Sequence, residues 1–537
     1  MLATVLRAGW APRLGYAALA LALGMPTLIA ISASLAALGN PLTQHWQHLW
    51  SVVLPLVSRN TLILMLQVAV IAGSLGTGLA WATARYDFPG RGLIHVLLLL
   101  PLALPGYVLG FVAIAGLDFA GPVQTAWRAW TGADTALWQF RSLAGAGLIL
   151  GLTLYPYVYL IARNAFVSIS PSMLDMASSL GRRRVFWSLA LPLAGPWIAG
   201  GLMLVCMEVL ADFGTVALFN VQTFTTAIYK SWYGFFDLQG ALQLASVLVL
   251  SALGLVLLHR LSLGAKRLEQ DGHGQLPLRS LSPLKRWLLS LSLTSFVVVV
   301  AGIPLATLLS WSWSSAATEL DSRYFEWLRR SLMIAGLGAA LLTMMAITMA
   351  YLARRQPSRG VLIAERVAGI GYALPGTLIA VGLFAPLADL EQWTSSWFGL
   401  GWLTQSLVVL LLGYWARFFS VAHTPIAQQL TRIRPSIDQA AHLQGYTGLH
   451  LLRRVHLPLI ASTVAGAVAL VLIDIIKEMP ITLMLRPSGF DTLSTRVFEL
   501  TAEGEYERAA LPALTIVLAG LIPVSLLLRN RNKASSR

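Results

Sequence analysis

The chain has 537 residues, of which 57% are hydrophobic and only 11% are charged, and its formal net charge is +15. A soluble globular domain carries roughly 25% charged residues, so this chain lacks the polar surface that a protein of its size needs in water. The composition excludes an ordinary soluble enzyme or binding domain and predicts a membrane protein. The single cysteine, Cys206, excludes a disulfide framework and a thiolate metal site.

Apolar segments recur along the whole chain at the length needed to cross a bilayer. About 20 helical residues span roughly 30 Å of hydrocarbon. The first segment is longer than the roughly 7–15 apolar residues of a secretory signal, so we interpret it as a retained helix. The sequence therefore predicts an all-α membrane protein of about twelve transmembrane helices. The predicted spans are 14–38, 61–84, 93–116, 143–165, 193–219, 240–258, 287–312, 331–353, 361–386, 402–421, 459–484 and 509–528.

The positive charge is concentrated on alternate loops between these spans. With the N-terminus inside, Arg182–Arg184, Arg354-Arg355 and Arg453-Arg454 all fall on the cytoplasmic side, whereas acidic residues cluster in the external loop 491–507. This is the positive-inside bias of multi-pass proteins of the cell (inner) membrane. Both termini are therefore expected in the cytoplasm. The basic charge reflects topology, which leaves membrane lipid as a partner and gives no support for nucleic acid.

Short motifs in the first half of the chain recur in the second half at an offset of 264 to 270 residues. The polar stretch 259–286 separates six spans from six. We therefore predict two homologous halves, 1–258 and 287–537, joined by a cytoplasmic linker at 259–286 and related by an axis along the membrane normal. The recurring motifs are Leu104-Pro105-Gly106 with Leu374-Pro375-Gly376, Pro171-Ser172 with Pro435-Ser436, and Leu191-Pro192-Leu193 with Leu457-Pro458-Leu459.

One cytoplasmic segment of each half has the pattern of a short capped helix. These segments are 171–192 and 435–458, and each opens on Pro-Ser. Ser172 and Ser436 are placed at the N-cap, with an acidic or amide residue three positions later, which is the spacing of a capping box. Small residues follow, and they permit the close approach of a partner surface. A short docking helix is therefore predicted in each half.

Each predicted short helix is followed by a bend and then by the next span. Gly181 and Gly445 provide the helix stop, because glycine tolerates the left-handed C′ conformation. Pro192 and Pro458 open the following transmembrane helix, where a missing N–H group costs little. For one copy, an ordinary amphipathic loop in the headgroup region is an equally good interpretation. Two copies at equivalent positions favour a docking element.

These two segments resemble the EAA loops of binding-protein-dependent ABC importers. The pattern of those loops is Glu-Ala-Ala, three residues, Gly, nine residues, Ile, one residue, Leu-Pro. The second segment keeps the spacing but has Gln for Glu, and the first segment has Asp-Met for Glu-Ala and is two residues shorter between Gly and Leu-Pro. The matching positions are Asp175, Ala177, Gly181 and Pro192 in the first segment and Gln439, Ala440, Ala441, Gly445 and Pro458 in the second.

The resemblance implies the fold of a type I ABC importer permease, in which each loop forms a coupling helix that docks on an ATPase subunit. It also implies that a periplasmic or extracellular solute-binding protein delivers the solute. The sequence contains no Gly-x4-Gly-Lys-Ser/Thr loop, so a separate ATPase subunit, expected as a homodimer, must hydrolyse the ATP. No cofactor, metal site or catalytic residue is expected in this chain, which is predicted to be a transport subunit and not an enzyme.

Two further segments, Met207–Lys230 and Asp474–Thr482, resemble fused permeases of the ferric-iron importer group. The resemblance implies ferric iron as the transported solute. Fused permeases of thiamine importers share the length and layout, and polyamine importers share the pattern of one half, so both remain alternatives. A secondary transporter is an alternative of a different class, although it would not need paired cytoplasmic docking loops. A membrane-embedded enzyme is another, for which only the charges buried in the spans offer material.

These segments also place five charged residues deep in predicted spans: Glu208, Asp212, Asp474, Lys477 and Glu478. A charge near the bilayer centre costs roughly 2.5–3.5 kcal/mol, so the five side chains are expected to face the bundle interior or a wet cavity. The carboxylates form two pairs, each one helical turn apart, and the pairs correspond at the repeat offset. They either line a translocation path or form a structural network with Lys477 and backbone N–H groups.

Overall fold

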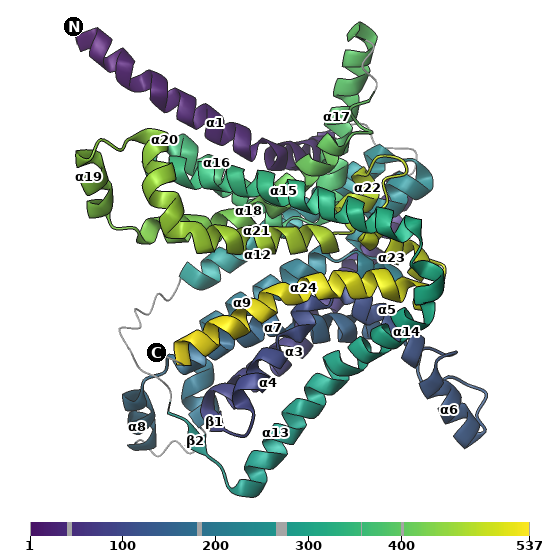
Figure 1. Cartoon of the computed structure of the whole chain (residues 1–537). Coiled ribbons are helices and arrows are strands. Elements are labelled where there is room, and N and C mark those ends of the chain that lie inside the picture. The colour runs from purple at the N-terminus through teal and green to yellow at the C-terminus, as the bar shows by residue number, and fades with distance from the viewer. Residues whose placement is uncertain are drawn as a thin grey trace. The chain divides into compact units, whose positions relative to one another are not determined.

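The computed structural model describes residues 2–39, 46–179, 185–264, 277–355, 357–398 and 402–535. This described part is almost entirely helical, as the sequence predicts (Figure 1). Within it, ten helices are long and apolar enough to cross a membrane: Gly15–Gly39, Leu49–Arg85, Gly106–Thr131, Leu143–Val167, Phe186–Ala211, Leu238–Leu258, Pro283–Glu319, Ser322–Arg355, Leu407–Arg432 and Gly448–Lys477.

The chain forms two compact units, and each of them draws on both halves of the sequence. Unit 1 comprises 1–45, 228–249 and 320–496, and unit 2 comprises 46–227, 250–319 and 497–537. Three helices pass from one unit to the other: α11 (Phe224–Tyr229), α12 (Leu238–Gly264) and α23 (Leu493–Ala502).

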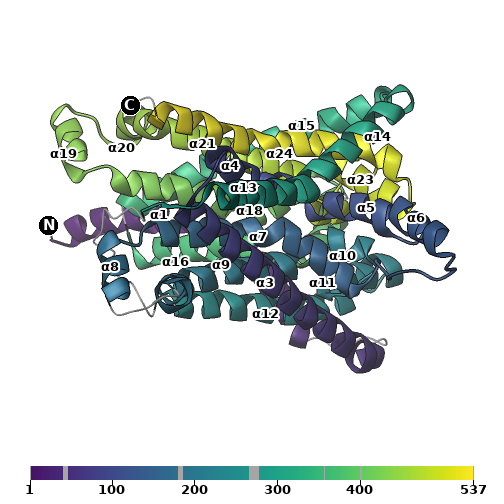
Figure 2. The same ribbon diagram turned by 90° about the horizontal axis from the view of Figure 1, so that it is seen from below.

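Unit 2 contains most of the first half of the chain. Its central helices α3, α7 and α9 pack on one another (Figure 2). The elements are α2 (Trp46–His48), η2 (Leu49–Val53), α3 (Leu54–Arg85), β1 (Tyr86–Asp87), α4 (Arg91–Leu97), η3 (Leu100–Ala103), α5 (Gly106–Leu117), α6 (Pro122–Thr131), α7 (Leu143–Val167), α8 (Pro171–Ser179), η4 (Phe186–Ala190), α9 (Leu191–Ala211), α10 (Gly214–Leu218), β2 (Arg279–Ser280), α13 (Pro283–Val297), η6 (Val298–Gly302), α14 (Ile303–Glu319) and α24 (Tyr506–Ser535).

Unit 1 contains most of the second half of the chain. Helices α15, α18 and α21 pack on one another at its centre. The elements are α1 (Leu2–Ala36), η1 (Ala37–Gly39), η5 (Lys230–Gly234), α15 (Ser322–Arg355), α16 (Arg359–Ile370), η7 (Gly371–Ala373), α17 (Gly376–Phe398), α18 (Leu407–Arg432), α19 (Pro435–Leu443), α20 (Gly448–Leu451), η8 (Leu452–His456), α21 (Leu457–Lys477) and α22 (Pro480–Leu485).

The first helix of each sequence half packs on elements of the other half. In unit 1, α1 lies against α16, α17 and α18, and the indole N–H of Trp415 donates to the carbonyl oxygen of Leu23 at 3.0 Å. In unit 2, α13 lies against α4 and α14 against α5, besides the contact of α14 with α24 of its own half, and the Ser290 hydroxyl donates to the carbonyl oxygen of Pro89 at 2.9 Å. Apolar periodicity alone does not predict this exchange, because it specifies that a helix is buried but not which partner buries it.

Residues inside the predicted linker also join unit 2. Strand β2 pairs in parallel with β1, with Tyr86 opposite Arg279, and α12 extends to Gly264, inside the predicted 259–286 linker. Residues 265–276 lie outside the described residues. The boundaries of the two sequence halves stay a prediction.

Two predicted spans, 93–116 and 361–386, are not continuous helices, so those two predictions were wrong. Each is broken at its Leu-Pro-Gly motif: α4 and η3 precede Pro105 and α5 follows it, whereas α16 and η7 precede Pro375 and α17 follows it. The physical reason is the proline, which lacks an N–H group and pushes the residue before it toward an extended conformation. Leu104 and Leu374 accordingly have ψ values of 108° and 134°. The last predicted span, 509–528, lies within α24.

Candidate functional site

A helix break in unit 2 is built around Asp212. Helix α9 ends at Ala211, and Asp212 is extended with ψ 133°, so the predicted span 193–219 is not one helix. The Asp212 carboxylate then caps α10: it accepts a hydrogen bond from the Val216 amide at 3.0 Å and from the Thr215 hydroxyl at 3.0 Å. A carboxylate at this position satisfies amide groups that would otherwise be orphaned at the start of a helix.

Unit 1 contains the same kind of break around Glu478. Helix α21 ends at Lys477, Glu478 is extended with ψ 121°, and α22 begins at Pro480, so the predicted span 459–484 is also interrupted. The Glu478 carboxylate accepts a hydrogen bond from the Ile481 amide at 3.1 Å. The backbone carbonyl oxygen of Glu478 accepts a hydrogen bond from the Thr482 hydroxyl at 2.8 Å. The repeat predicted from the sequence is therefore visible in the hydrogen bonds of the two breaks.

A hydroxyl-rich segment supports each break. The Thr225 hydroxyl donates to the carbonyl oxygen of Asp212 at 2.7 Å, and the Ser494 hydroxyl donates to that of Glu478 at 2.8 Å. Sequence reasoning included 223–226 only as part of the resemblance of Met207–Lys230, missed 492–495, and assigned neither segment a supporting role, because both lie outside the charged pairs. The signal that was available is Thr-Phe-Thr-Thr at 223–226, which recurs as Thr-Leu-Ser-Thr at 492–495.

The break in unit 1 contains a buried ion pair. Arg417 of α18 lies with its Nε 3.5 Å from the Glu478 carboxylate, and the two side chains are only 12% and 7% exposed. Close approach is possible because residue 376 is glycine: a Cβ there would lie 2.8 Å from Glu478 Oε1 and 2.9 Å from Arg417 Nη1. Sequence reasoning missed Arg417, although its charge inside the predicted span 402–421 was the available signal.

The break in unit 2 has neutral groups in the corresponding place. A Cβ on Gly106, the repeat counterpart of Gly376, would lie 2.6 Å from the Thr215 hydroxyl and 3.8 Å from that of Thr153. Thr153 of α7 therefore occupies the region that Arg417 occupies in unit 1. The two repeats share a backbone arrangement but differ in charge.

The remaining predicted charges lie close to the two breaks. Glu208 is a partly buried residue of α9, one turn before Asp212. Lys477 Nζ lies 2.7 Å from Asp474 Oδ1 on α21, so its ion-pair partner is Asp474, whereas Glu478 pairs with Arg417. The sequence left open a structural network with Lys477 and backbone N–H groups; the contacts include both of these and add Arg417. The translocation path stays a prediction.

The second predicted docking segment forms the short helix α19, which projects from the end of α18 (Figure 1). The helix begins at Pro435 without a side-chain cap, so the prediction of Ser436 as N-cap was wrong. Helix α8 likewise begins at Pro171, so Ser172 is its second residue and not its N-cap. Proline takes the first position in both helices because its missing N–H group would have no partner there anyway.

The C-terminus of α19 confirms the predicted glycine stop. Gly445 has φ +82°. The Tyr446 amide donates to the carbonyl oxygen of Ala441 at 3.0 Å, and the Gly445 amide donates to that of His442 at 2.9 Å. This is the hydrogen-bond pattern of a Schellman motif, which turns the chain sharply after a helix.

One face of α19 is exposed and partly apolar. Gln439 and Ala440 are exposed and Leu443 is 92% exposed, whereas Ala441 is buried against the body of unit 1. Leu443 adds apolar surface to a face that otherwise carries small and polar side chains. The face is suited to contact another protein.

An ion-pair cluster holds α19 to the transmembrane helices. Asp438 Oδ2 lies 2.8 Å from Arg354 Nη2 at the end of α15, and Asp438 Oδ1 lies 2.8 Å from His456 Nε2 in η8. Arg354 also donates to the carbonyl oxygens of Leu430 and Ile433 at the end of α18. Burial by itself raises the pKa of the Asp438 carboxyl, but the hydrogen bonds from His456 and Arg354 outweigh it and bring the pKa below its ordinary value.

The first docking segment is described only in part. Helix α8 buries Leu174 and exposes Met173 and Met176, which are 39% and 58% exposed. Gly181 lies outside the described residues, and the side chains of Asp175 and Ala177 are also outside them. The described part of α8 therefore presents an apolar face, as α19 does.

Pro192 and Pro458, which follow the docking segments, lie in the first turn of α9 and of α21, where the sequence predicts them. Pro192 follows the π-helical turn η4, and Pro458 follows the π-helical turn η8, each near the start of a longer helix. A π-turn is a local widening of the helix, which accommodates the ring and the missing N–H group of the proline without ending the helix.

With this geometry described, the chain can be compared with known proteins. The model of the family "Binding-protein-dependent transport system inner membrane component" matches it twice, at residues 72–263 and 342–532. The chain therefore belongs to this family, as a multi-pass membrane protein with two permease repeats. The double match confirms the repeat and the permease class that the sequence predicts.

Individual relatives carry substrate names. The chain is 29% identical over 479 residues to the Fe(3+)-transport system permease protein FbpB 2 of Haemophilus influenzae, covering 87% of this chain and 88% of that protein. It is 28% identical to the molybdenum transport system permease protein ModB of Escherichia coli K12, covering 34% of this chain and 80% of that protein. It is 24% identical to the molybdate/tungstate transport system permease protein WtpB of Thermococcus kodakarensis, covering 39% of this chain and 78% of that protein. All three relatives are transport permeases, which agrees with a role other than catalysis.

Proposed function

We propose that this chain is the membrane-spanning permease of an ATP-driven importer for ferric iron. The observation that carries the substrate is the likeness to an Fe(3+)-transport permease along both repeats, over 87% of the chain. The likeness to the molybdenum permease extends over 34% of the chain. At 479 residues, the likeness to the Fe(3+)-transport permease extends into both repeats.

The proposal requires two kinds of partner. An ATPase subunit, present as a homodimer, binds and hydrolyses ATP, and α8 and α19 each dock on one copy of it. A periplasmic or extracellular solute-binding protein brings the iron to the opposite face. Both chain termini and the 259–286 linker then lie on the cytoplasmic side, with the docking helices. The exposed apolar residues Met176 and Leu443 support the docking role.

The ion pairs of unit 1 supply a mechanical route from the docking helix into the membrane. A displacement of α19 moves Asp438, and the Asp438 contacts pass it to Arg354 on α15 and to His456 in η8. Helix α21 follows η8 directly and has 21 residues, or about 30 Å at 1.5 Å per residue. The far end of α21 is the break at Glu478. Closure of the ATPase dimer is thereby transmitted to the buried Glu478–Arg417 pair.

The proposed path for released iron passes Glu208, Asp212, Asp474, Lys477 and Glu478. Oxygen donors suit a hard cation, by extension of the rule for calcium and magnesium. Conduction also requires that no single site holds the ion too tightly, which carboxylates shared with helix caps and ion pairs satisfy. The existing hydrogen bonds of Asp212 and Glu478 reduce their capacity to trap iron.

Molybdate is the second candidate solute, and Arg417 is the observation that favours it. A buried guanidinium group is a natural partner for an oxyanion, and molybdenum permeases are among the relatives. The two candidates are separated by measuring ATP hydrolysis of the complete transporter with each loaded binding protein. Stimulation by the iron-loaded protein supports the proposal. Stimulation only by a molybdate-loaded, thiamine-loaded or polyamine-loaded protein rejects the substrate assignment and leaves the permease role standing.

A further inference from the structure

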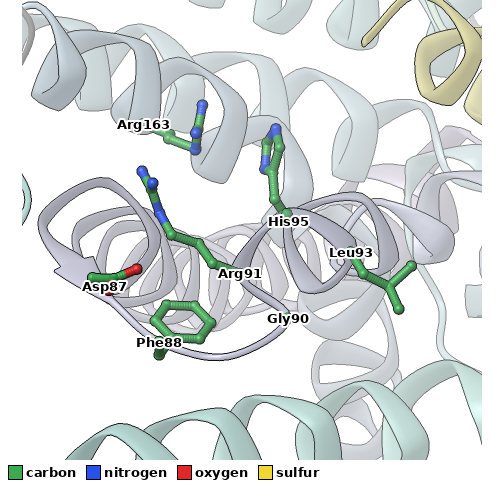
Figure 3. Close-up of a pocket in the computed structure, with 8 residues that line it drawn as sticks. Asp87, Phe88, Gly90, Arg91, Leu93, His95 and Arg163 are labelled. Atoms are coloured by element: carbon green, nitrogen blue, oxygen red, sulfur yellow. The ribbon is translucent and has the colours of Figure 1, made fainter. Parts of the chain in front are cut away.

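A polar cavity lies in unit 2, away from both helix breaks. Its volume is about 570 Å³, within the range of small-molecule sites. It is formed where the turn after β1 and the start of α4 meet the C-terminal part of α7. The side chains that the argument uses are Asp87, Phe88, Arg91, Leu93, His95 and Arg163 (Figure 3).

Basic groups from two elements converge on this cavity. Figure 3 shows the guanidinium groups of Arg91 and Arg163 pointing toward one another across it, with the His95 ring beside them. Both arginines are partly buried. An anion placed between two guanidinium groups is attracted by both of them.

Hydrogen bonds fix the walls of the cavity. Arg91 Nε donates to the carbonyl oxygen of Thr83 at 2.8 Å, which orients the guanidinium plane. His95 Nδ1 and the Tyr159 hydroxyl are hydrogen-bonded at 2.6 Å, and that hydroxyl is 3.1 Å from the Thr83 hydroxyl. A site whose donors are already held in place loses little side-chain entropy when a ligand binds.

The acidic residue of the cavity wall has a partner of its own. Asp87 Oδ2 lies 3.5 Å from Arg286 Nη2, and both side chains are partly exposed. The Asp87 carboxylate therefore has an ion-pair partner other than Arg91 and Arg163.

The second repeat does not reproduce the basic pair. The counterpart of Arg91 is Arg359, which is exposed on α16. The position that corresponds to Arg163, at the offset that pairs Pro171 with Pro435, is Ala427. The arrangement therefore does not follow from the fold of the repeat, and a role confined to the first repeat explains it.

We propose that this cavity binds a phosphate-bearing anion between Arg91 and Arg163. A guanidinium fork recognises phosphate through two parallel hydrogen bonds, and the volume accommodates more than one phosphate group. The source is either a soluble phosphate compound or the headgroup of an acidic lipid, because basic pockets between helices bind such headgroups. Leu93, 59% exposed on the outer side of α4, is compatible with a lipid environment beside the cavity. The proposal rests on unit 2 alone and does not depend on the transported solute.

The ligand would join two segments that lead to a docking helix. Arg163 lies just before the last turn of α7, and α8 begins at Pro171. An anion that bridges Arg91 and Arg163 ties α4 to the end of α7 and so stiffens the base of α8. Binding is therefore expected to raise the stability of the chain as well as to occupy the cavity.

The test uses the full-length chain with its ATPase in nanodiscs of phosphatidylcholine. Inorganic pyrophosphate is titrated at constant ionic strength, and the melting temperature and the heat of binding are measured. In a second arm, phosphatidylglycerol is added to the nanodiscs and the melting temperature is measured without pyrophosphate. A rise in the melting temperature with pyrophosphate identifies a soluble anion as the ligand. A rise in the melting temperature with phosphatidylglycerol alone identifies a lipid headgroup.

Three variants make the test specific. Arg163→Gln should weaken pyrophosphate binding about tenfold or more, or abolish the lipid effect, because a charge-assisted contact is lost. Arg163→Lys keeps the charge without the planar fork and should weaken binding less. Arg359→Gln removes the exposed counterpart and should bind as the wild type does. The proposal is overturned if neither pyrophosphate nor phosphatidylglycerol raises the melting temperature of the wild type. It is also overturned if the melting temperatures of Arg163→Gln and Arg163→Lys both respond to these anions as that of the wild type does.

Discussion

Asp438 Oδ1, in the middle of the helix α19, lies 2.8 Å from His456 Nε2, in the turn η8 at the start of the transmembrane helix α21. His456 is 1% exposed and lies in the π-helical turn that precedes Pro458. The first repeat has Leu174 and Ala190 at the corresponding positions, and both are buried. Helices α19 and α8 are therefore anchored differently, the first by an ion-pair cluster and the second by apolar packing.

Replacing Asp438 should uncouple the second docking helix. Asp438→Asn keeps the shape of the side chain but removes the charge that Arg354 and His456 contact, so solute uptake should fall several-fold while the protein still inserts. The measurement is uptake at equal amounts of inserted transporter. Asp389→Asn, an exposed carboxylate on α17, is the control and should transport normally. Equal uptake by the two variants would show that the cluster does not transmit motion.

The same residue predicts a dependence of stability on pH. The pKa of Asp438 in the folded protein lies below its ordinary value, so its contribution is fully present above the unfolded pKa of about 3.9. The contribution is lost as the pH falls through the folded value. The melting temperatures of wild type and Asp438→Asn should therefore differ most at neutral pH and converge in acid. A difference that grows on acidification would contradict the assignment.

Gly445 should tolerate only residues that accept the left-handed conformation. Gly445→Val places a β-branched side chain at φ +82°, which costs about 1–3 kcal/mol, and should abolish uptake by displacing α19. Gly445→Asn should retain much of the activity, because asparagine visits this region readily. Normal solute-stimulated ATP hydrolysis in the valine variant would argue against a coupling role for the bend.

The carboxylates of unit 2 test the proposed path. Changing Glu208 to Gln and Asp212 to Asn removes charge but keeps shape, so insertion should survive and iron uptake should fall, with stimulated ATP hydrolysis less affected. Asp134→Asn, an exposed residue of the same unit, serves as the control. Unchanged iron uptake in the double variant rejects the path and leaves a structural role for these carboxylates.

Arg417 and Glu478 should depend on one another. Arg417→Gln leaves a buried carboxylate without its partner, a change that typically costs roughly 3–5 kcal/mol, so the melting temperature should drop clearly. Adding Glu478→Gln removes the stranded charge and should restore part of the loss. A double variant that is less stable than either single variant would indicate that the two side chains act independently.

The sequence predicts the permease class and the repeat well because both depend on local patterns. Span length, Leu-Pro-Gly recurrence and the glycine after α19 are each encoded within a few residues, and Gly445 adopts the predicted conformation. The interruption of spans at Asp212 and Glu478 was harder to predict, because the apolar runs continue across both breaks. The break depends on tertiary partners such as Thr225 and Ser494, which lie 13 and 16 residues away.

Two other features follow only from three-dimensional packing. The exchange of α1 and α13 between the repeats depends on which surface buries each helix, and hydropathy does not carry that information. Arg417 was overlooked because it stands alone in its span, whereas the predicted charges came in pairs. Its partner Glu478 is 61 positions further along the chain, beyond the reach of periodicity.

The most direct test of the central proposal is uptake of radiolabelled iron by proteoliposomes that contain this chain and its ATPase, with the iron-loaded binding protein outside and ATP inside. The account predicts ATP-dependent accumulation of iron that is lost in Gly445→Val and unaffected in Asp389→Asn. Accumulation that does not require the ATPase would contradict the importer mechanism. ATP-dependent accumulation of molybdate or thiamine, with none of iron, would contradict the assignment of ferric iron.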